Sequence, residues 1–229
     1  MGAAPRGGRL TPEALEAGAW LAERGAVLPE SALATLDAYA KDVLEYGART
    51  NLTAASTAAE LWRRHILDGL AALAPLRSRL EGKPRPRVLD LGCGGGFVGV
   101  ALAAAWPEAE VWLVDSVYKK TSFLTWTTTR LRLPNVRVVH GRADGTGALE
   151  LLRHAGGASG RTEPMADAVT ARALAPRDEA FTLARPLAAP GGWTALFTSD
   201  RPEEGETEVY RLPGEEKDRY ISFVRKEPT

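Results

Sequence analysis

Hydrophobic positions recur with a helical period through the first third of the chain. Residues 11–25 open with a Thr–Pro pair that favours a helix start, and residues 29–47 carry a clear apolar stripe. After a polar break, residues 57–76 restore the same period. The pattern predicts three helices, the second ending at Gly47, and we interpret residues 1–80 as an N-terminal helical cap.

Beyond residue 86 the pattern changes, and short apolar runs alternate with helical segments. The predicted strands span 87–91, 110–116, 135–141, 166–173 and 191–198. The predicted helices between them span 98–105, 117–131, 147–155 and 177–188. Strands that are apolar almost throughout and separated by helices predict a parallel sheet covered on both faces.

The C-terminal part of the chain lacks this alternation. Residues 206–212 and 219–226 have no helical segment between them, which predicts an antiparallel hairpin at the edge of the sheet. The glycine-rich stretch 154–164 is predicted to be a surface loop. Residues 81–229 therefore read as one α/β core with a doubly wound, mostly parallel, Rossmann-like sheet and an antiparallel terminal hairpin.

The stretch "RVLDLGCGGGFVGVALA", residues 87–103, has the order strand, glycine turn, helix. Gly94, Gly96 and Gly99 fit G-x-G-x-x-G, a pattern that by itself is only weak evidence for dinucleotide binding. The same stretch also reads D-x-G-x-G-x-G, formed by Asp90, Gly92, Gly94 and Gly96. We expect Asp90 to meet the amino-acid end of S-adenosyl-L-methionine (SAM), and the glycines to let the main chain approach the cofactor.

A second carboxylate, Asp115, ends the next predicted strand and suits the two hydroxyls of a ribose. Because NAD and SAM share that ribose, Asp115 supports both cofactors. The terminal hairpin, and the lack of a second domain to hold a dehydrogenase substrate, favour a SAM-dependent methyltransferase. An NAD(P)-binding oxidoreductase remains the alternative.

Composition narrows the class of protein further. Lys and Arg number 29 and Asp and Glu number 29, which argues against a protein that coats nucleic acid non-specifically. Charge is unevenly distributed, because residues 111–153 hold seven basic and three acidic side chains. A single cysteine, no long apolar run and no secretory signal predict a cytoplasmic protein. The histidines are too scattered for a metal site, and we expect no metal, no membrane contact and a monomer.

Seven segments taken together resemble one family, the bacterial small-subunit ribosomal RNA guanine-N7 methyltransferases, also called the glucose-inhibited division protein B family. The segments are "NLTA" at 51–54, "WRRHILDGL" at 62–70, "VLDLGCGGGFVG" at 88–99, "LVDSVYKKTSFL" at 113–124, "NVRVVHGRAD" at 135–144, "VTARALAP" at 169–176 and "RYISFVRK" at 219–226. The resemblance implies methyl transfer from SAM to N7 of a guanine in 16S ribosomal RNA, presented as RNA or as the small ribosomal subunit.

The resemblance also implies roles for individual residues. Gly92, Phe97, Asp115, Ala143, Asp144 and Arg172 would bind the cofactor. Asn51, His65 and Arg172 would act at the reaction centre, beside Arg64 and Asp68. RNA phosphates would be contacted by Arg64, Lys119, Lys120 and Arg142. Guanine N7 carries a free lone pair, so the reaction needs orientation rather than a general base.

The chain departs from the family pattern at three places. Val98 stands where the family usually has proline, and Gly69 where it usually has serine. At the end of the fifth predicted strand the family typically has a lysine followed by a glycine, whereas here Ser199 or Asp200 stands in place of the basic residue and acidic residues follow, with Arg201 as a basic residue that could compensate. Losing that cation should weaken contact with an RNA phosphate. A further alternative is therefore a SAM-binding relative whose methyl acceptor is different or lost.

Overall fold

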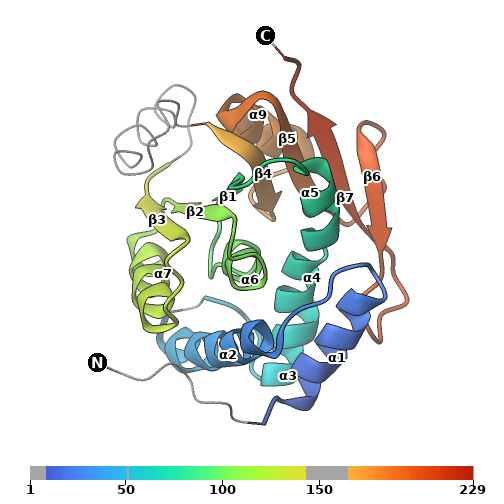
Figure 1. Ribbon diagram of the computed structural model, residues 1–229. Coiled ribbons are helices and arrows are strands. Elements are labelled where there is room, and N and C mark those ends of the chain that lie inside the picture. Colours follow the sequence, from blue (N-terminus) through green and yellow to red (C-terminus); the bar gives the residue numbers. More distant parts are fainter. Residues whose placement is uncertain (1–8, 51, 143–164, 229) are drawn as a thin grey trace.

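A mixed sheet forms the centre of the computed structural model, which describes residues 9–50, 52–142 and 165–228 (Figure 1). Its described strands are β1 (Arg87–Leu91), β2 (Glu110–Asp115), β3 (Val136–His140), β4 (Ala166–Arg172), β5 (Ala188–Thr198), β6 (Glu206–Tyr210) and β7 (Arg219–Arg225). They lie in the order β3-β2-β1-β4-β5-β7-β6. Strands β1 to β5 run parallel, whereas β7 pairs antiparallel with β5 and β6. The predicted doubly wound sheet with its antiparallel terminal hairpin is confirmed.

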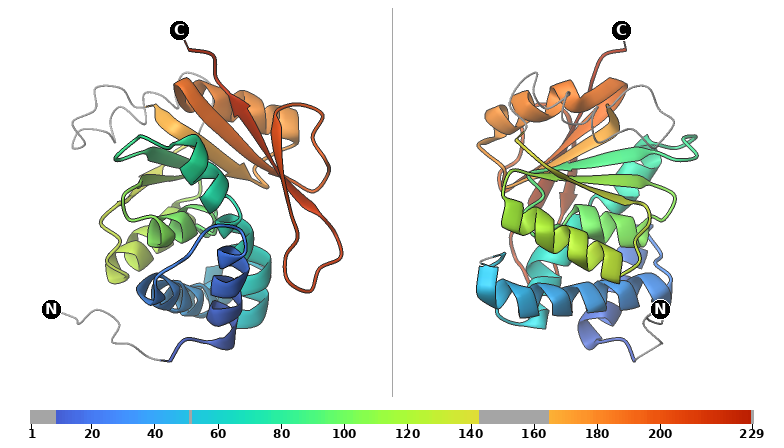
Figure 2. Two further views of the ribbon diagram at one scale, coloured as in Figure 1. Left: turned by 45° about the vertical axis from the view of Figure 1, so that its right-hand side comes forward. Right: turned by 90° about the vertical axis from the view of Figure 1, so that its left-hand side faces the viewer.

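Helices cover both faces of the sheet, as Figures 1 and 2 show. The helices α6 (Gly99–Ala105) and α7 (Tyr118–Arg130) lie on one face, and α9 (Arg177–Ala184) lies on the other. Every residue of α6 is buried, because α2 (Glu30–Thr50) packs outside it as a further layer. Chain order reverses between β1 and β4, and such a switch point is where α/β sheets open a crevice for ligands.

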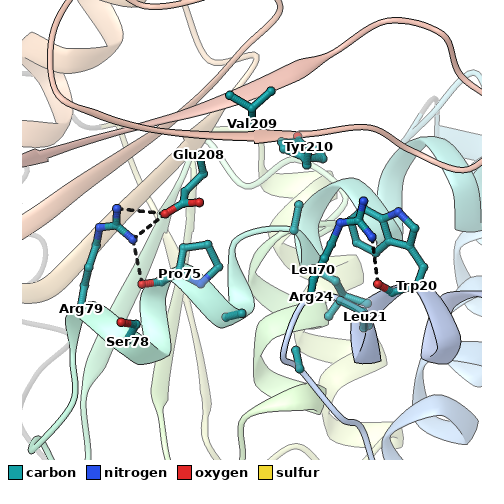
Figure 3. Close-up of a pocket in the computed structure, with 13 residues that line it drawn as sticks. Trp20, Leu21, Arg24, Leu70, Pro75, Ser78, Arg79, Glu208, Val209 and Tyr210 are labelled. Carbon is teal, nitrogen blue, oxygen red and sulfur yellow. Dashed lines mark hydrogen bonds and ion pairs between the residues drawn. The ribbon is translucent and has the colours of Figure 1, made fainter.

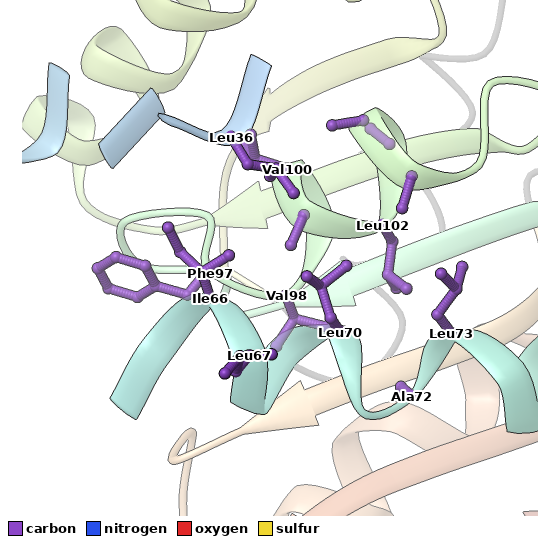
Figure 4. Close-up of a cluster of buried hydrophobic side chains, with 14 of the residues drawn as sticks. Leu36, Ile66, Leu67, Leu70, Ala72, Leu73, Phe97, Val98, Val100 and Leu102 are labelled. Atoms are coloured by element: carbon purple, nitrogen blue, oxygen red, sulfur yellow. The ribbon is translucent and has the colours of Figure 1, made fainter. Parts of the chain in front are cut away.

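The third predicted helix is interrupted rather than continuous. It is divided into α3 (Ala58–Leu61), a π-helical turn (Trp62–Ile66), α4 (Leu67–Leu70) and α5 (Leu73–Arg79). The wider turn lets Trp62 and Ile66 both point into the core while His65 stays accessible. Figure 4 shows α4 packing its leucines against the start of α6. The expected end of the second helix at Gly47 is wrong, because α2 continues to Thr50.

The N-terminal helices are joined to one another through one carboxylate. Thr11 caps α1 (Pro12–Ala22), and its backbone N–H and hydroxyl both donate to Asp37 of α2. The indole of Trp62 donates to the same carboxylate at 3.0 Å. A single hydrophobic cluster runs from these helices into one face of the sheet. The division of the chain at residue 80 stays a prediction.

Strand β5 begins earlier than the sequence indicates. The strand predicted over 191–198 starts at Ala188, and its pairing with β4 slips between Ala166 and Ala168, which leaves a bulge before Trp193. Gly192 fits there because a Cβ would lie 2.9 Å from the Asp167 carbonyl oxygen. The predicted helix over 147–155 and the glycine-rich stretch 154–164 both lie outside the described residues.

Candidate cofactor and acceptor sites

The glycine loop follows β1 and leads directly into α6. Gly92, Gly94 and Gly96 have φ values of 64°, 58° and 89°, a left-handed conformation that other residues rarely adopt. At Gly92 a Cβ would also collide with the side chain of Leu174, 2.4 Å away. Tyr39 of α2 donates its hydroxyl hydrogen to the Gly95 carbonyl at 2.6 Å. The loop is therefore held from the helical side as well as from the sheet.

Asp115 lies where β2 ends and is attached to the loop. One carboxylate oxygen accepts from the Gly94 N–H and the other from the Val117 N–H, each at 2.8 Å. A carboxylate has about four acceptor positions, so two remain for ligand hydroxyls. Asp115 and Gly92 line a cavity of about 450 Å³, with apolar surface from Leu174 and Leu183. A ribose and an adenine fit this combination of free acceptors and apolar wall.

Asp90 does not line this cavity. It is 1% exposed, and its carboxylate accepts from the Gly99 N–H and the Thr170 hydroxyl, both at 2.9 Å. Burial raises the pKa of Asp90 to about 6. The structure places Asp90 behind the loop, where it ties β1 to the first turn of α6 and to β4. The expected contact of Asp90 with the amino-acid end of the cofactor stays a prediction, and in the structure both of its carboxylate oxygens already accept hydrogen bonds.

A second cavity of about 610 Å³ adjoins the first. Its lining residues are Arg64, His65, Asp68, Arg172, Ala173, Phe197, Thr198, Ser199, Asp200, Tyr210, Glu215, Lys217, Asp218 and Arg219. Ala173 lines both cavities and has a φ of 50°, which is unusual for a residue with a Cβ. Local strain of this kind clusters at functional sites. A ligand in one cavity thus lies next to a ligand in the other.

Asp68 organises the wall of the second cavity. One carboxylate oxygen accepts from Arg172 at 2.8 Å. The other accepts from the Tyr210 hydroxyl at 2.6 Å and from Arg219 at 3.1 Å. Asp68 itself is 4% exposed, so it joins α4 to β4, β6 and β7 in a largely buried network. Sequence reasoning missed Tyr210 and Arg219, because they lie more than 140 positions from Asp68 in the chain.

His65 is held on three sides. Its ring stacks on Phe97 with centroids 4.6 Å apart, Nδ1 lies 3.4 Å from Arg172 and Nε2 lies 3.1 Å from the Thr53 hydroxyl. Burial and the Arg172 guanidinium lower the pKa of His65 to about 4. A guanidinium can only donate, so the neutral ring accepts at Nδ1 and donates from Nε2–H to Thr53. The geometry supports a positioning role for His65.

The predicted RNA contacts divide between the two cavities. Lys120 and Arg142 line the first cavity and Arg64 lines the second, whereas Lys119 lines neither. Asn51, Ala143 and Asp144 lie outside the described residues. Cys93 is buried in the loop, and burial raises the pKa of its thiol well above the usual value.

The segment that departs from the family pattern borders the second cavity. Ser199 and Asp200 line it directly, and the Thr198 hydroxyl donates to the Asp200 carbonyl at 2.8 Å. Arg201 lines a neighbouring hollow with Glu203 instead. Lys217 lines the same cavity as Asp200 and forms no ion pair with any described residue. It therefore supplies a free ammonium on the side where the family lysine is missing.

A further hollow, of about 350 Å³, lies between α1, α5 and β6 and shares Tyr210 with the second cavity (Figure 3). Arg24 covers the ring of Trp20 on one side, and Arg79 binds Glu208 on the other. The Trp20 indole donates to the Arg211 carbonyl at 3.0 Å. These contacts fasten the N-terminal helices to the terminal hairpin.

The described ranges hold neither a metal-binding cluster nor a membrane-spanning helix. Those ranges contain no group of three or more His, Cys, Asp and Glu side chains arranged to hold a metal ion. None of the helices in them combines the length and apolar character that crossing a bilayer requires.

Comparisons with known proteins bear on the whole chain. The family model described as rRNA small subunit methyltransferase G matches residues 32–219. Proteins named ribosomal RNA small subunit methyltransferase G are similar to this chain. The one from Sorangium cellulosum is 33% identical over 204 residues, 89% of this chain and 80% of the relative. The one from Leptothrix cholodnii is 38% identical over 147 residues, 64% of this chain and 60% of the relative.

Among solved structures, that of an MtNAS mutant superposes with a TM-score of 0.55 at 14% identity. The match covers 86% of this chain and 72% of that one, and at this identity it supports the fold alone. The family match extends from α2 into β7 and so includes the glycine loop, Asp115, Asp68 and Arg172. It favours the methyltransferase interpretation over the oxidoreductase alternative. This chain belongs to the rRNA small subunit methyltransferase G family.

Proposed function

We propose that this protein transfers a methyl group from SAM to N7 of a guanine in 16S ribosomal RNA. The observation that carries the proposal is the meeting of two cavities at Ala173, one fitted to a nucleoside and the other lined by aromatic rings and by both basic and acidic side chains. SAM supplies an electrophilic methyl group bound to a sulfonium. The residues of the chain bind the cofactor and the guanine and orient them relative to each other.

Cofactor binding is assigned to the first cavity. Asp115 would accept from the ribose hydroxyls, and Leu174 and Leu183 would contact the adenine. Gly92 leaves the main chain accessible at the cavity wall. Asp90, Gly94 and Gly96 act from behind by fixing the loop. Ala143 and Asp144 keep their assignment to the adenine as a prediction.

The guanine is assigned to the second cavity. N7 has a free lone pair at neutral pH, so alignment of that atom with the methyl group is what the protein must provide. Arg172 lines this cavity, and its guanidinium carbon lies 5.4 Å from the ring centroid of Phe97, which is buried and does not line it. Neutral His65 holds both of them without taking a proton from the substrate. Asn51 keeps its place beside this wall as a prediction.

The setting of the reaction follows from the substrate. A base edge is reached most readily in an unstacked RNA segment, either free or within the small subunit. Arg64, Lys120 and Arg142 border the cavities and would contact phosphates. We propose that the protein works in the cytoplasm, without a metal, and as a monomer. Sedimentation of the purified chain, with and without SAM, tests the monomeric state.

The direct test uses small ribosomal subunits from cells that lack this activity. Labelled methyl from SAM is expected at one guanine, as N7-methylguanosine, and Asp115→Ala is expected to abolish the transfer. Asp178→Ala, which removes a carboxylate that is 97% exposed on α9, is the matched control and should retain full activity. If SAM binds and no methyl reaches the RNA, the acceptor is wrong and the protein is a SAM-binding relative with another role.

A further inference from the structure

A groove of about 690 Å³ runs between α7 and β3, outside both cavities described above. It is lined by Tyr118, Thr121, Ser122, Thr125, Trp126, Thr129, Arg130, Val138 and His140. Most of these side chains project from one face of α7. The assignment of the two cavities to cofactor and guanine does not use this surface.

Two aromatic rings are exposed along the groove. Tyr118 is 71% exposed and Trp126 is 46% exposed. They are eight residues apart on one helix, which corresponds to a rise of about 12 Å. Tyr118 rests edge-on against His140, and Trp126 stacks on Tyr46, so both rings are held in place. Exposed, fixed rings at this spacing suit bases that are a few nucleotides apart.

The side chains between the rings are hydroxyls. Thr125 and Thr129 donate to carbonyl oxygens of the preceding helical turn, which leaves their oxygen lone pairs facing outward. Ser122 lies in the groove between the two rings. Such hydroxyls can exchange hydrogen bonds with ribose 2′-hydroxyls, whereas a purely apolar partner would leave them unpaired.

The chain segment that forms the groove carries charge of one sign. Residues 116–142 contain six Lys and Arg side chains and no Asp or Glu. Arg130 is held by Asp42 of α2. Lys119 and Arg132, in contrast, are exposed and form no ion pair within the described ranges. At the other end of the sheet, residues 200–229 hold nine acidic and six basic side chains. A polyanion would therefore approach the α7 side and avoid the hairpin.

The groove also leads to the cofactor cavity. Val117 and Lys120, which flank Tyr118, line that cavity. Tyr118 thus stands between the two, at the carboxyl end of the sheet. A strand that occupied the groove could continue directly toward the place assigned to the reaction.

We propose that the α7 groove binds a single-stranded segment of RNA next to the target guanine, with bases stacked on Tyr118 and Trp126. Lys119 would contact a phosphate, since it lies one helical turn from Ser122 and two turns from Trp126, on the same side of the helix. Duplex RNA cannot present its base faces to the rings, so the site selects unpaired nucleotides. The proposal rests on RNA being the substrate, as proposed above, and adds where the strand flanking the target lies.

The test measures binding of a short fluorescein-labelled single-stranded RNA by anisotropy, with the same sequence as a duplex for comparison. Tyr118→Ala is expected to weaken single-strand binding about tenfold, while Tyr118→Phe, which keeps the ring, stays near wild type. Trp126→Leu is the second variant, checked for folding by thermal unfolding because Trp126 packs on Tyr46. Val209→Ala removes an exposed apolar side chain at the far end of the sheet and serves as the matched control.

Methyl transfer to small subunits separates the groove from the proposed function. Tyr118→Ala is expected to raise the KM for the subunit, leave kcat nearly unchanged and leave SAM affinity unchanged. If transfer proceeds and both aromatic variants bind RNA like wild type, the groove proposal is overturned and the function stands. If the wild-type protein transfers no methyl group to the subunit, and Tyr118→Ala loses RNA binding, the groove proposal is supported and the proposed function is overturned. A wild-type protein that binds no single-stranded RNA overturns the groove proposal.

Discussion

Gly69 lies so close to Phe97 that a Cβ at position 69 would sit 2.2 Å from the Phe97 carbonyl oxygen. The same Cβ would be 2.9 Å from the Cα of Val98. Two of the three departures from the family pattern, Gly69 and Val98, are therefore neighbours in space. Helix α4 approaches the glycine loop through a contact that only a glycine allows, and the loop backbone cannot move without disturbing α6.

Gly69→Ala is expected to destabilise the protein by about 1–3 kcal/mol, because the added methyl group overlaps backbone rather than a flexible side chain. Urea unfolding measures this change, and SAM affinity should fall with it as the loop shifts. Gly47→Ala is the matched control, since nothing lies within 4 Å of its Cβ in α2. That substitution should be neutral or slightly stabilising. Equal behaviour of the two variants would contradict the close contact.

Removing the carboxylate of Asp68 should be costly. Asp68→Ala leaves Arg172, whose side chain is only 19% exposed, without its anionic partner, and we expect a loss of about 3 kcal/mol. Denaturant unfolding gives the value. Asp218→Ala breaks the exposed pair with Arg211 and should change stability by less than about 1 kcal/mol. A small effect at both positions would mean that the Asp68 network does not stabilise the fold.

The lowered pKa of His65 predicts a pH dependence of stability. The unfolded chain binds a proton on this ring near pH 6.5, whereas the folded protein does so only near pH 4. The contribution of His65 is therefore present above pH 6.5 and is lost as the pH falls toward 4. After solvent screening we expect an effect on the order of 1 kcal/mol. The unfolding free energies of wild type and His65→Gln are measured at pH 7.5 and pH 5. The difference between the two proteins should be smaller at pH 5 than at pH 7.5, or reversed in sign.

The buried hydroxyl of Tyr39 should matter for cofactor binding. Tyr39→Phe leaves the Gly95 carbonyl without its donor, at an expected cost of about 1–2 kcal/mol in unfolding free energy. Because Gly95 belongs to the loop, calorimetric titration should also show weaker SAM binding. Tyr220→Phe, at a partly buried hydroxyl on β7, is the control and should leave SAM affinity unchanged. Unaltered SAM binding in Tyr39→Phe would mean that α2 does not help hold the loop.

A positive charge restored at the acceptor cavity should strengthen RNA binding. Asp200→Lys places an ammonium where Asp200 now lines the cavity. One added phosphate contact should steepen the salt dependence of RNA affinity by about one unit in the log–log slope. Glu108→Lys adds the same charge at the amino end of β2, on the opposite edge of the sheet, and should have a much smaller effect. Equal slopes would show that Asp200 lies away from the RNA path.

Much of the sheet could be predicted from sequence because strand and helix periods are local properties. The parallel core, the glycine turn and the edge hairpin all follow from patterns of fewer than twenty residues. The π-helical turn at Trp62–Ile66 could not be predicted in this way. It depends on Trp62 reaching Asp37 while Ile66 reaches the core, and both requirements come from packing.

The residues of the candidate site also divide into those that a local sequence pattern predicts and those whose placement depends on packing. Asp115 was recognisable because it ends a strand, and its carboxylate does line the first cavity. Asp90 ends the neighbouring strand by the same rule, yet its carboxylate turns away to Gly99 and Thr170. The strand pattern gives the place of a side chain but not its direction. The partners of Asp68 come from three separate segments, β4, β6 and β7, and no local pattern connects them.

The zero net charge conceals a permanent electric dipole moment. Cations gather around α7 and β3 at one end of the sheet, and anions gather around β6 and β7 at the other. A protein with zero net charge and separated basic and acidic ends gains no long-range attraction to a polyanion, but the field of the polyanion turns it as it approaches. Encounters with RNA would thus start with the basic end leading, and a larger share of them would be productive at low ionic strength than in concentrated salt.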